Sequence, residues 1–252
     1  MNYSNSLELM CIYGSDGDTD GARSQTNRLF FSAIVEDVKK MLGTTLNEEP
    51  IYQINYQLKS TIDSVVMTTK EAWRYFDVSG RTSERQALIK SRPVAGDLDL
   101  GEQFLSRLDS WIYPHYLSVA EITEIKALKR RIEQLTRTAG EETVDLEKGR
   151  GGIRDIEFVI QFLQLLHGGE LSSVRVSNTL QAIERLGAEG CLRDQEQSLL
   201  ADNYRFLCSV EHRLQLTFGP QAYRLPREGR ERDQLAEDLG YAPVNRSDGQ
   251  SF

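Results

Sequence analysis

The sequence predicts an α+β fold, in which strands and helices alternate over the first hundred residues and a helical bundle follows. Two observations support this prediction. Up to about residue 96, short apolar or alternating segments typical of strands are interleaved with helical periodicities. From about residue 97 onward, the apolar patterns have the period of a helix and no strand signal appears. We therefore expect an α/β domain over residues 1–96, a helical bundle over 97–243 and a disordered tail over 244–252.

The first part of the chain contains four segments with the pattern of strands and two with the pattern of helices. Residues 7–13 are mostly apolar and end in a cluster of turn residues, whereas residues 51–58 alternate apolar and polar side chains as a half-buried strand does. The remaining segments are strands over 65–67 and 87–94 and helices over 23–42 and 70–76. This mixture favours a sheet that is partly antiparallel.

The second part of the chain contains helical periodicities, several of which end at glycine, a common helix stop. They cover residues 104–112, 119–135, 153–166, 178–186, 194–216 and 232–239. The helix over 153–166 is strongly apolar and stops at Gly168-Gly169, so we expect it to be buried. The basic run in the helix over 119–135 is interpreted as a solvated face.

The bulk composition excludes several functional classes. The chain has 252 residues, of which 39% are hydrophobic and 27% charged, as is ordinary for a soluble globular protein. A net charge of −8 argues against non-specific binding of nucleic acid, which needs a basic surface. No apolar run is long enough to span a membrane, and the first residues do not resemble a secretion signal. The three cysteines and three histidines are isolated, so we expect reduced thiols in a cytoplasmic protein and no zinc site.

Residues 148–161, KGRGGIRDIEFVIQ, combine a glycine-rich turn with the start of an apolar helix. Glycines such as Gly151 and Gly152 let a backbone turn tightly and approach a ligand closely. The helix start offers unpaired N–H groups and a positive dipole end, both of which suit an anion. Arg150 and Arg154 add fork-shaped donors that match phosphate oxygens. The stretch therefore predicts a phosphate-binding loop.

The same stretch also has a purely structural interpretation. Most glycine-rich turns are only turns, and a motif of this kind has a high rate of false matches. Asp155 and Glu157 lie in the first helical turn, where acidic side chains complement the helix dipole. They can also pair with Arg150 and Arg154. For the two acidic residues we favour this structural role over a catalytic one.

Four segments of the chain share their order and spacing with the motifs of one known family. They are NYSNSLELMCIYGSDGDTDG at 2–21, IYQINYQLKS at 51–60, GRTSERQALIKSRPVAGD at 80–97 and KGRGGIRDIEFVIQ at 148–161. Through them the chain resembles the bifunctional glutamine synthetase adenylyltransferase/adenylyl-removing enzymes, in which the first three segments read ELNYSSDIDLIF, VYRVDMRLRP and GRDWERYAMIKAR. The NYS and IRDIEF forms favour the N-terminal, deadenylylating half of that family, so we expect a fragment of a longer protein.

The resemblance implies a nucleotidyltransferase-like fold. In this family, two aspartates on one strand and a third on a neighbouring strand hold two Mg²⁺ ions, which bridge the nucleotide phosphates during phosphoryl transfer. The N-terminal half uses phosphate to remove AMP from a tyrosine of glutamine synthetase and releases ADP, whereas the C-terminal half attaches AMP from ATP. The nitrogen-signalling protein PII and glutamine set the balance between the two reactions.

The residues at the metal-binding positions depart from the family pattern. The two aspartates of the first strand fall on Ser6 and Glu8, and the third falls on Asn55. The resemblance makes these three the candidate catalytic residues, with Glu8 as the remaining metal ligand. Because Mg²⁺ prefers hard anionic oxygens in octahedral geometry, a hydroxyl and an amide at two of the positions weaken the site.

The cations of the matching segments are retained, and the resemblance implies that they bind the phosphates of ATP or ADP. The candidate nucleotide-binding residues are Lys90, Arg92, Arg150, Gly151, Gly152 and Arg154. Arg85 lies in the same matching segment as Lys90 and Arg92.

Three functional interpretations follow. The first is a fragment of an adenylyltransferase/deadenylylase with a degraded metal site, acting on glutamine synthetase and linked to PII through the full-length protein. The second is a non-catalytic module that senses nucleotide or binds glutamine synthetase. The third places the chain near the uridylyltransferases that modify PII, which by our matching share the Asp-x-Asp strand but not the helix at 148–161. Replacement of three residues at one metal site favours loss of activity in this chain.

Overall fold

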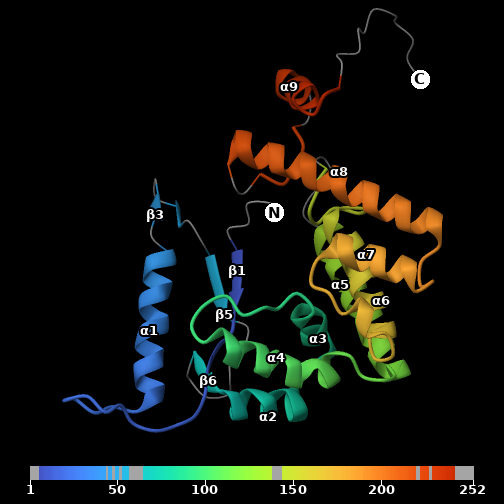
Figure 1. The fold of residues 1–252 in the computed structure, drawn as a ribbon. Coiled ribbons are helices and arrows are strands. Elements are labelled where there is room, and N and C mark those ends of the chain that lie inside the picture. The colour runs from blue at the N-terminus through green and yellow to red at the C-terminus, as the bar shows by residue number, and fades with distance from the viewer. Residues whose placement is uncertain are drawn as a thin grey trace, which may run out of the picture. The chain divides into compact units, whose positions relative to one another are not determined.

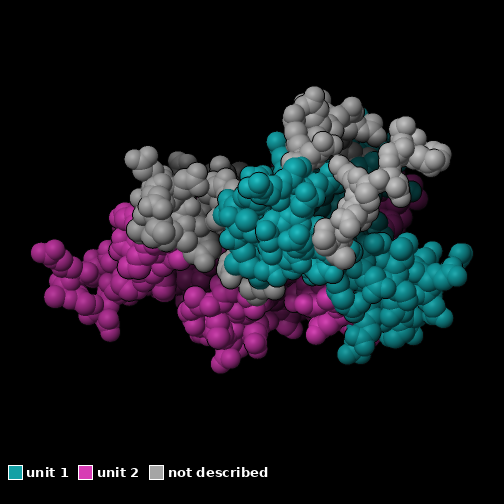
Figure 2. Space-filling model, turned by 90° about the horizontal axis from the view of Figure 1, so that it is seen from above, with its two compact units in different colours: residues 1–3, 126–160, 183–252 teal, residues 4–125, 161–182 magenta. Residues whose placement is uncertain are grey.

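The structure is a computed structural model that describes residues 6–43, 45–46, 49–50, 53–56, 65–137, 144–219, 222–226 and 229–241. Strands and helices alternate in the first part of the chain and helices follow, so the predicted α+β composition is confirmed (Figure 1). The chain divides into two compact units, coloured separately in Figure 2. We call residues 4–125 with 161–182 the strand unit, and residues 1–3, 126–160 and 183–252 the loop unit. The division into domains at residues 96 and 97 stays a prediction.

The described strands all belong to the strand unit and form three two-stranded pairs. Strand β1 pairs with β5 and β2 pairs with β6, both in parallel, whereas β3 and β4 are antiparallel. Their bounds are β1 Ser6–Leu9, β2 Cys11–Tyr13, β3 Thr45–Leu46, β4 Glu49–Pro50, β5 Gln53–Tyr56 and β6 Val66–Thr68. Parallel strands need a long crossover connection, and helix α1, Asn27–Leu42, lies in the chain between the first and second members of the parallel pairs.

The strand prediction needs two refinements. The predicted strand over 7–13 is interrupted at Met10, so that its two halves pair with two different partners. Among the described strands, the expected antiparallel pairing is present only between the two-residue strands β3 and β4, and isolated antiparallel bridges join Asp18 to Thr26 and Asp145 to Arg224. Of the predicted strand over 51–58, residues 53–56 form β5, and the flanking positions lie outside the described residues.

The helices match the predicted periodicities closely. Those in the strand unit are α1, α2 Thr69–Ser79, α3 Thr82–Leu88, α4 Leu98–Ile112 and the short 3₁₀-helix η1 Ser172–Val174. Helices α5 Val119–Arg137, α6 Ile153–His167 and α7 Thr179–Ala188 contribute residues to both units, and α8 Asp194–Phe218 and α9 Arg230–Asp238 belong to the loop unit. None of the helices described is both long and apolar enough to cross a membrane. The tail over 244–252 lies outside the described residues.

The predicted strand over 87–94 is wrong, because its first residues end helix α3 and the rest form a turn and an irregular segment. The Glu84 carboxylate accepts the backbone N–H of Arg81 at 2.7 Å, which satisfies a donor at the helix start. Thr82, Gln86 and Leu88 are buried, the first two of them four residues apart on one face of the helix. The sequence signal that we missed is this N-terminal cap, since the apolar run at 87–89 also suits a strand.

Aromatic side chains hold helices α2 and α4 together in the strand unit. The rings of Trp73 and Phe104 stack with their centroids 5.9 Å apart, and those of Phe76 and Trp111 lie 4.8 Å apart. A Cβ on Gly80 would lie 2.3 Å from a Trp111 ring atom, so only glycine fits at this turn between α2 and α3. The packing fixes α3 and the segment that follows it.

The loop unit has its own core, formed by residues that precede and residues that follow the glycine-rich segment in the chain. Buried Leu146 packs with Val210 and Leu214 of α8 and Leu235 of α9. Backbone hydrogen bonds add to this contact, since the N–H of Leu146 donates to the carbonyl of Tyr223 at 2.8 Å and that of Leu225 to Val144 at 3.0 Å. The start of the glycine loop is therefore anchored to the segment that joins α8 to α9.

Candidate functional site

Two of the predicted catalytic residues meet at the pairing of β1 with β5. Glu8 and Asn55 are register partners on these parallel strands, and both side chains are exposed. Ser6 lies on β1 two positions earlier, opposite Gln53, although its side chain is outside the part that the structure describes. The parallel pairing of β1 with β5 therefore brings Glu8 and Asn55 side by side, and their role as metal-binding positions stays a prediction.

The donor set at these positions does not fit a two-metal Mg²⁺ site. Glu8 supplies one carboxylate and Asn55 a neutral amide oxygen. Among the described residues, no group of three or more histidine, cysteine, aspartate or glutamate side chains is arranged to hold a metal ion. Since Mg²⁺ is bound mainly through carboxylates and phosphates, one carboxylate supplies too few anionic oxygens to hold two such ions. We therefore derive no chemical step through a metal at this position.

A polar network that the sequence analysis missed lies where strands β2 and β6 end. The Arg28 guanidinium donates to both carboxylate oxygens of Glu71 at 2.7 and 2.8 Å and to the carbonyl of Val66 at 3.3 Å. Glu71 also accepts the N–H of Thr68, the residue that caps α2. Burial raises the pKa of Glu71, but the bonds from Arg28 and Thr68 outweigh it and hold the pKa below its ordinary value.

The network extends to the turn after β2. The buried Tyr13 hydroxyl donates to Asp16 at 2.7 Å, and the Thr69 hydroxyl donates to the carbonyl of Gly14 at 3.1 Å. Burial and the bond to Asp16 raise the pKa of Tyr13 to about 12. These contacts join α1, β2, β6 and α2, so the described polar groups at this edge serve mainly to fix the fold.

The predicted cations Lys90 and Arg92 follow helix α3 in the strand unit. Leu88 and Ile89 are buried beside them, and the N–H of Lys90 donates to the carbonyl of Ala87 at 3.4 Å. Lys90 is half-buried and Arg92 is exposed. Lys90 therefore lies in a turn that is anchored by its apolar neighbours, and Arg92 lies in the irregular segment after it, rather than in the strand that we predicted.

The glycine loop before α6 is a tightly bonded turn in the loop unit. The Asp145 carboxylate accepts the N–H groups of Glu147 and Lys148 at 3.0 and 2.7 Å. A Cβ on Gly149 would lie 2.2 Å from the Asp145 carbonyl oxygen, and one on Gly152 would lie 2.6 Å from that of Leu146. These glycines are thus required by the turn itself.

The N–H groups at the start of α6 already have partners within the chain. Those of Gly152, Ile153 and Arg154 donate to backbone carbonyls at 2.9, 2.9 and 3.1 Å. The N–H of Gly151, whose φ is +76°, donates to the Asp155 carboxylate at 2.8 Å. Asp155 therefore occupies the helix start as an internal anion, which agrees with the structural interpretation of this residue.

The side chains around the loop divide into those that are paired and those that face solvent. Arg154 forms an ion pair with Glu147 at 3.3 Å, and Glu157 accepts the Tyr204 hydroxyl at 2.9 Å. Arg150 is exposed. Any phosphate bound here would meet mainly arginine side chains, because the backbone N–H groups of residues 151–154 already have partners.

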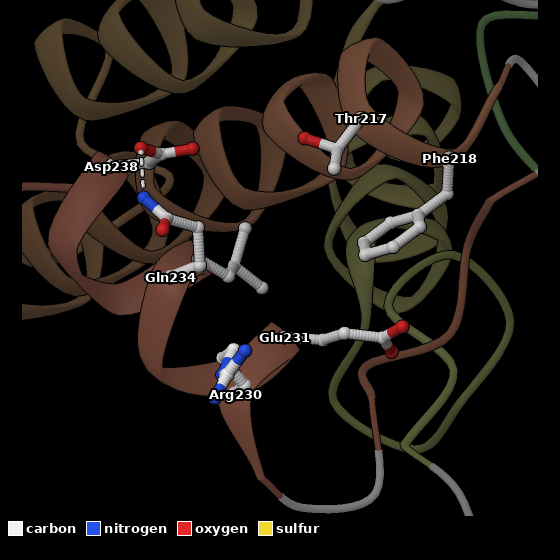
Figure 3. Close-up of a pocket in the computed structure, with 7 residues that line it drawn as sticks. Thr217, Phe218, Arg230, Glu231, Gln234 and Asp238 are labelled. Atoms are coloured by element: carbon white, nitrogen blue, oxygen red, sulfur yellow. Dashed lines mark hydrogen bonds between the residues drawn. The ribbon is translucent and has the colours of Figure 1, made fainter.

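A separate pocket of about 250 Å³ lies between the last turn of α8 and helix α9 (Figure 3). Phe218 and Leu235 provide its apolar surface, and Gln234 donates to Asp238 at 3.2 Å at its rim. The remaining lining residues are Thr217, Arg230 and Glu231. The pocket contains none of the predicted site residues.

Comparison with known proteins matches the two parts of the chain to two different family models. Residues 1–107 match the family model described as glutamate-ammonia ligase adenylyltransferase, and residues 123–252 match that described as GlnD PII-uridylyltransferase. Both descriptions name nucleotidyltransferases. The second match includes residues 148–161, the helix that we expected uridylyltransferases not to share.

The curated relatives identify the family more closely. Bifunctional glutamine synthetase adenylyltransferase/adenylyl-removing enzymes from Xanthomonas campestris pv. campestris (strain B100), Stenotrophomonas maltophilia (strain K279a) and Hahella chejuensis (strain KCTC 2396) are 34%, 32% and 30% identical to the chain, over 96%, 97% and 96% of its length. The chain belongs to this family of bifunctional enzymes. It spans about a quarter of the length of these relatives, namely 26%, 26% and 25%.

Proposed function

We propose that the chain acts in the reversible adenylylation of glutamine synthetase, either transferring a nucleotidyl group to a tyrosine or removing AMP from it by phosphorolysis, and that its own metal site is degraded. The register of Glu8 with Asn55 supports this proposal, because the two residues that by resemblance fall on metal-binding positions are neighbours and only one of them is a carboxylate. The activity for which the relatives are named supplies the substrate, glutamine synthetase.

We infer that cationic side chains bind the phosphates of the nucleotide. In the strand unit, Lys90 and Arg92 would contact phosphate oxygens of ATP or ADP, and in the loop unit Arg150 and Arg154 would do so. Such contacts need no Mg²⁺, although Mg²⁺ ordinarily neutralises developing charge in phosphoryl transfer. We also propose that the chain is cytoplasmic and that PII controls it through the full-length protein. The part of the family that it resembles is the deadenylylating half.

The test is an assay of the purified chain with adenylylated glutamine synthetase and phosphate, in which release of ADP is measured. We expect slow release by the natural chain and at least about tenfold faster release by the Glu8→Asp/Asn55→Asp variant, since two aspartates restore charge and reach at the metal positions. Equal, undetectable release from both proteins would contradict a catalytic role.

The second candidate function is a non-catalytic module that senses nucleotide or binds glutamine synthetase. This function is favoured because the backbone N–H groups of residues 151–154 already have partners within the chain. The glycine loop therefore offers a charged surface but no free backbone N–H groups at these positions to bind a phosphate. The same assay separates the two functions, because a module of this kind would bind adenylylated glutamine synthetase in sedimentation experiments and release no ADP even after both substitutions.

A further inference from the structure

Arg85 is a cation of the matching segment at 80–97, but its guanidinium already contacts other side chains of the chain. Its side chain is 16% exposed on helix α3, and it forms an ion pair with Glu121 of helix α5. The guanidinium also lies over the ring of Trp111, with its central carbon 5.0 Å from the centroid. A planar guanidinium suits this combination of ion pair and stacking better than an ammonium does.

Glu121 is itself held in place at the start of α5. Its carboxylate accepts the backbone N–H and the hydroxyl of Ser118 at 2.7 and 2.8 Å. One turn earlier on α3 and one turn later on α5, the Thr82 hydroxyl donates to Glu124 at 2.7 Å. Two side-chain contacts therefore tie α3 to the first turns of α5, with Thr82 opposite Glu124 and Arg85 opposite Glu121.

This attachment matters because α3 has seven residues and cannot be stable by itself. The turn that carries Lys90 continues directly from it, since the N–H of Ile89 donates to the carbonyl of Arg85 at 3.3 Å and that of Ser91 to Leu88 at 3.0 Å. The position of Lys90 and the direction in which Arg92 leaves the turn thus depend on the position of α3.

We propose that Arg85 is a positioning residue, which through Glu121 fixes α3 against α5 and so places Lys90 and Arg92 to bind a nucleoside diphosphate. The inference rests on the proposed nucleotide binding by these two cations. Arg85 itself would not contact the ligand, although it lies in the same sequence segment as the two cations that we propose to bind phosphate.

The test compares the ADP affinity of Arg85→Met, Glu121→Gln and the double variant. The affinity is measured by calorimetry in EDTA, at a temperature where each variant is folded. We expect each single substitution to weaken ADP binding by about tenfold, and the double variant to be no weaker than the singles, because all three break one contact. Arg85→Lys should recover part of the affinity. Arg205→Met, which removes an exposed arginine paired with Asp202, is the matched control and should leave the affinity unchanged.

Two results would overturn the inference. Weaker binding in Arg85→Met with full affinity in Glu121→Gln would mean that Arg85 contacts the ligand, and unchanged affinity in both would mean that the pair serves stability alone. Hydrogen exchange provides a readout that does not depend on ADP, since the amides of residues 89–91 should exchange faster in both single variants. If the natural chain does not bind ADP, the proposed function fails, whereas unchanged exchange at 89–91 would refute the positioning role itself.

Discussion

Glu8 and Asn55 are register partners on the parallel strands β1 and β5, so a carboxylate introduced at position 55 would stand beside the one at position 8. Directly paired residues on neighbouring strands have Cβ atoms roughly 5 Å apart, which is close enough for two side chains to bind one ion. An aspartate at position 55 would therefore add a negative charge beside Glu8 on the strand pairing already present.

The Asn55→Asp substitution should raise the affinity of the chain for Mn²⁺. A second carboxylate beside Glu8 adds a negative oxygen donor, and we expect a gain of about tenfold, equivalent to about 1.4 kcal/mol. Titration followed by the water-proton relaxation of bound Mn²⁺ measures this affinity. Asn203→Asp is the matched control, since it adds the same charge at an exposed position on α8 in the other unit. An equal gain in both variants would show that only net charge had changed.

Alanine at Gly149 should strongly destabilise the loop unit. The new Cβ would meet the Asp145 carbonyl oxygen at 2.2 Å, and this backbone atom cannot move without loss of the turn. We expect a loss of about 2–3 kcal/mol in the free energy of unfolding, from overpacking and backbone strain. Urea denaturation followed by circular dichroism gives the value. Gly21→Ala, where a Cβ has open space, should change stability by less than about 0.5 kcal/mol, and similar losses at both sites would contradict the account.

Removal of the Asp155 carboxylate should free the start of α6 for an external anion. Asp155→Ala loses the acceptor for the Gly151 N–H, which should cost about 1 kcal/mol of stability, whereas Asp155→Asn keeps an acceptor and should lose less. Phosphate should then raise the melting temperature of the alanine variant more than that of the natural chain. An identical response to phosphate in the two proteins would argue that the helix start is not an anion site even when vacated.

The Arg28–Glu71 contact should make stability depend on acid pH. Because the pKa of folded Glu71 lies below its ordinary value of 4.5, its stabilisation is present above pH 4.5 and is lost as the pH falls through the lower folded value. Asp16 and Tyr13 are the other titratable groups near Arg28. The Glu71→Gln variant should be about 1–3 kcal/mol less stable at pH 7 and should lose less stability on acidification. Denaturation at pH 7 and at pH 3 measures both effects, and equal pH slopes for the two proteins would contradict this assignment.

Periodicity sufficed to predict most helices, because their apolar faces repeat over several turns, as in α4 and α8. It failed at α3, where a seven-residue helix is determined by a cap and by contacts with α4 and α5 that lie far apart in sequence. The sequence also indicated that Glu8 and Asn55 come together, since family motifs marked both. It did not reveal that Asp155 fills the start of α6 or that Arg28 pairs with Glu71, because both contacts depend on three-dimensional packing.

The central claim is that this chain binds nucleotide through its cations and not through a metal. Calorimetric titration with ADP, in Mg²⁺ and again in EDTA, tests that claim most directly. The account predicts binding of similar affinity under both conditions, and weaker binding in Arg92→Gln, which removes an exposed proposed ligand. Tight binding in Mg²⁺ that disappears in EDTA would contradict it, because Glu8 and its neighbours would then still hold a metal ion.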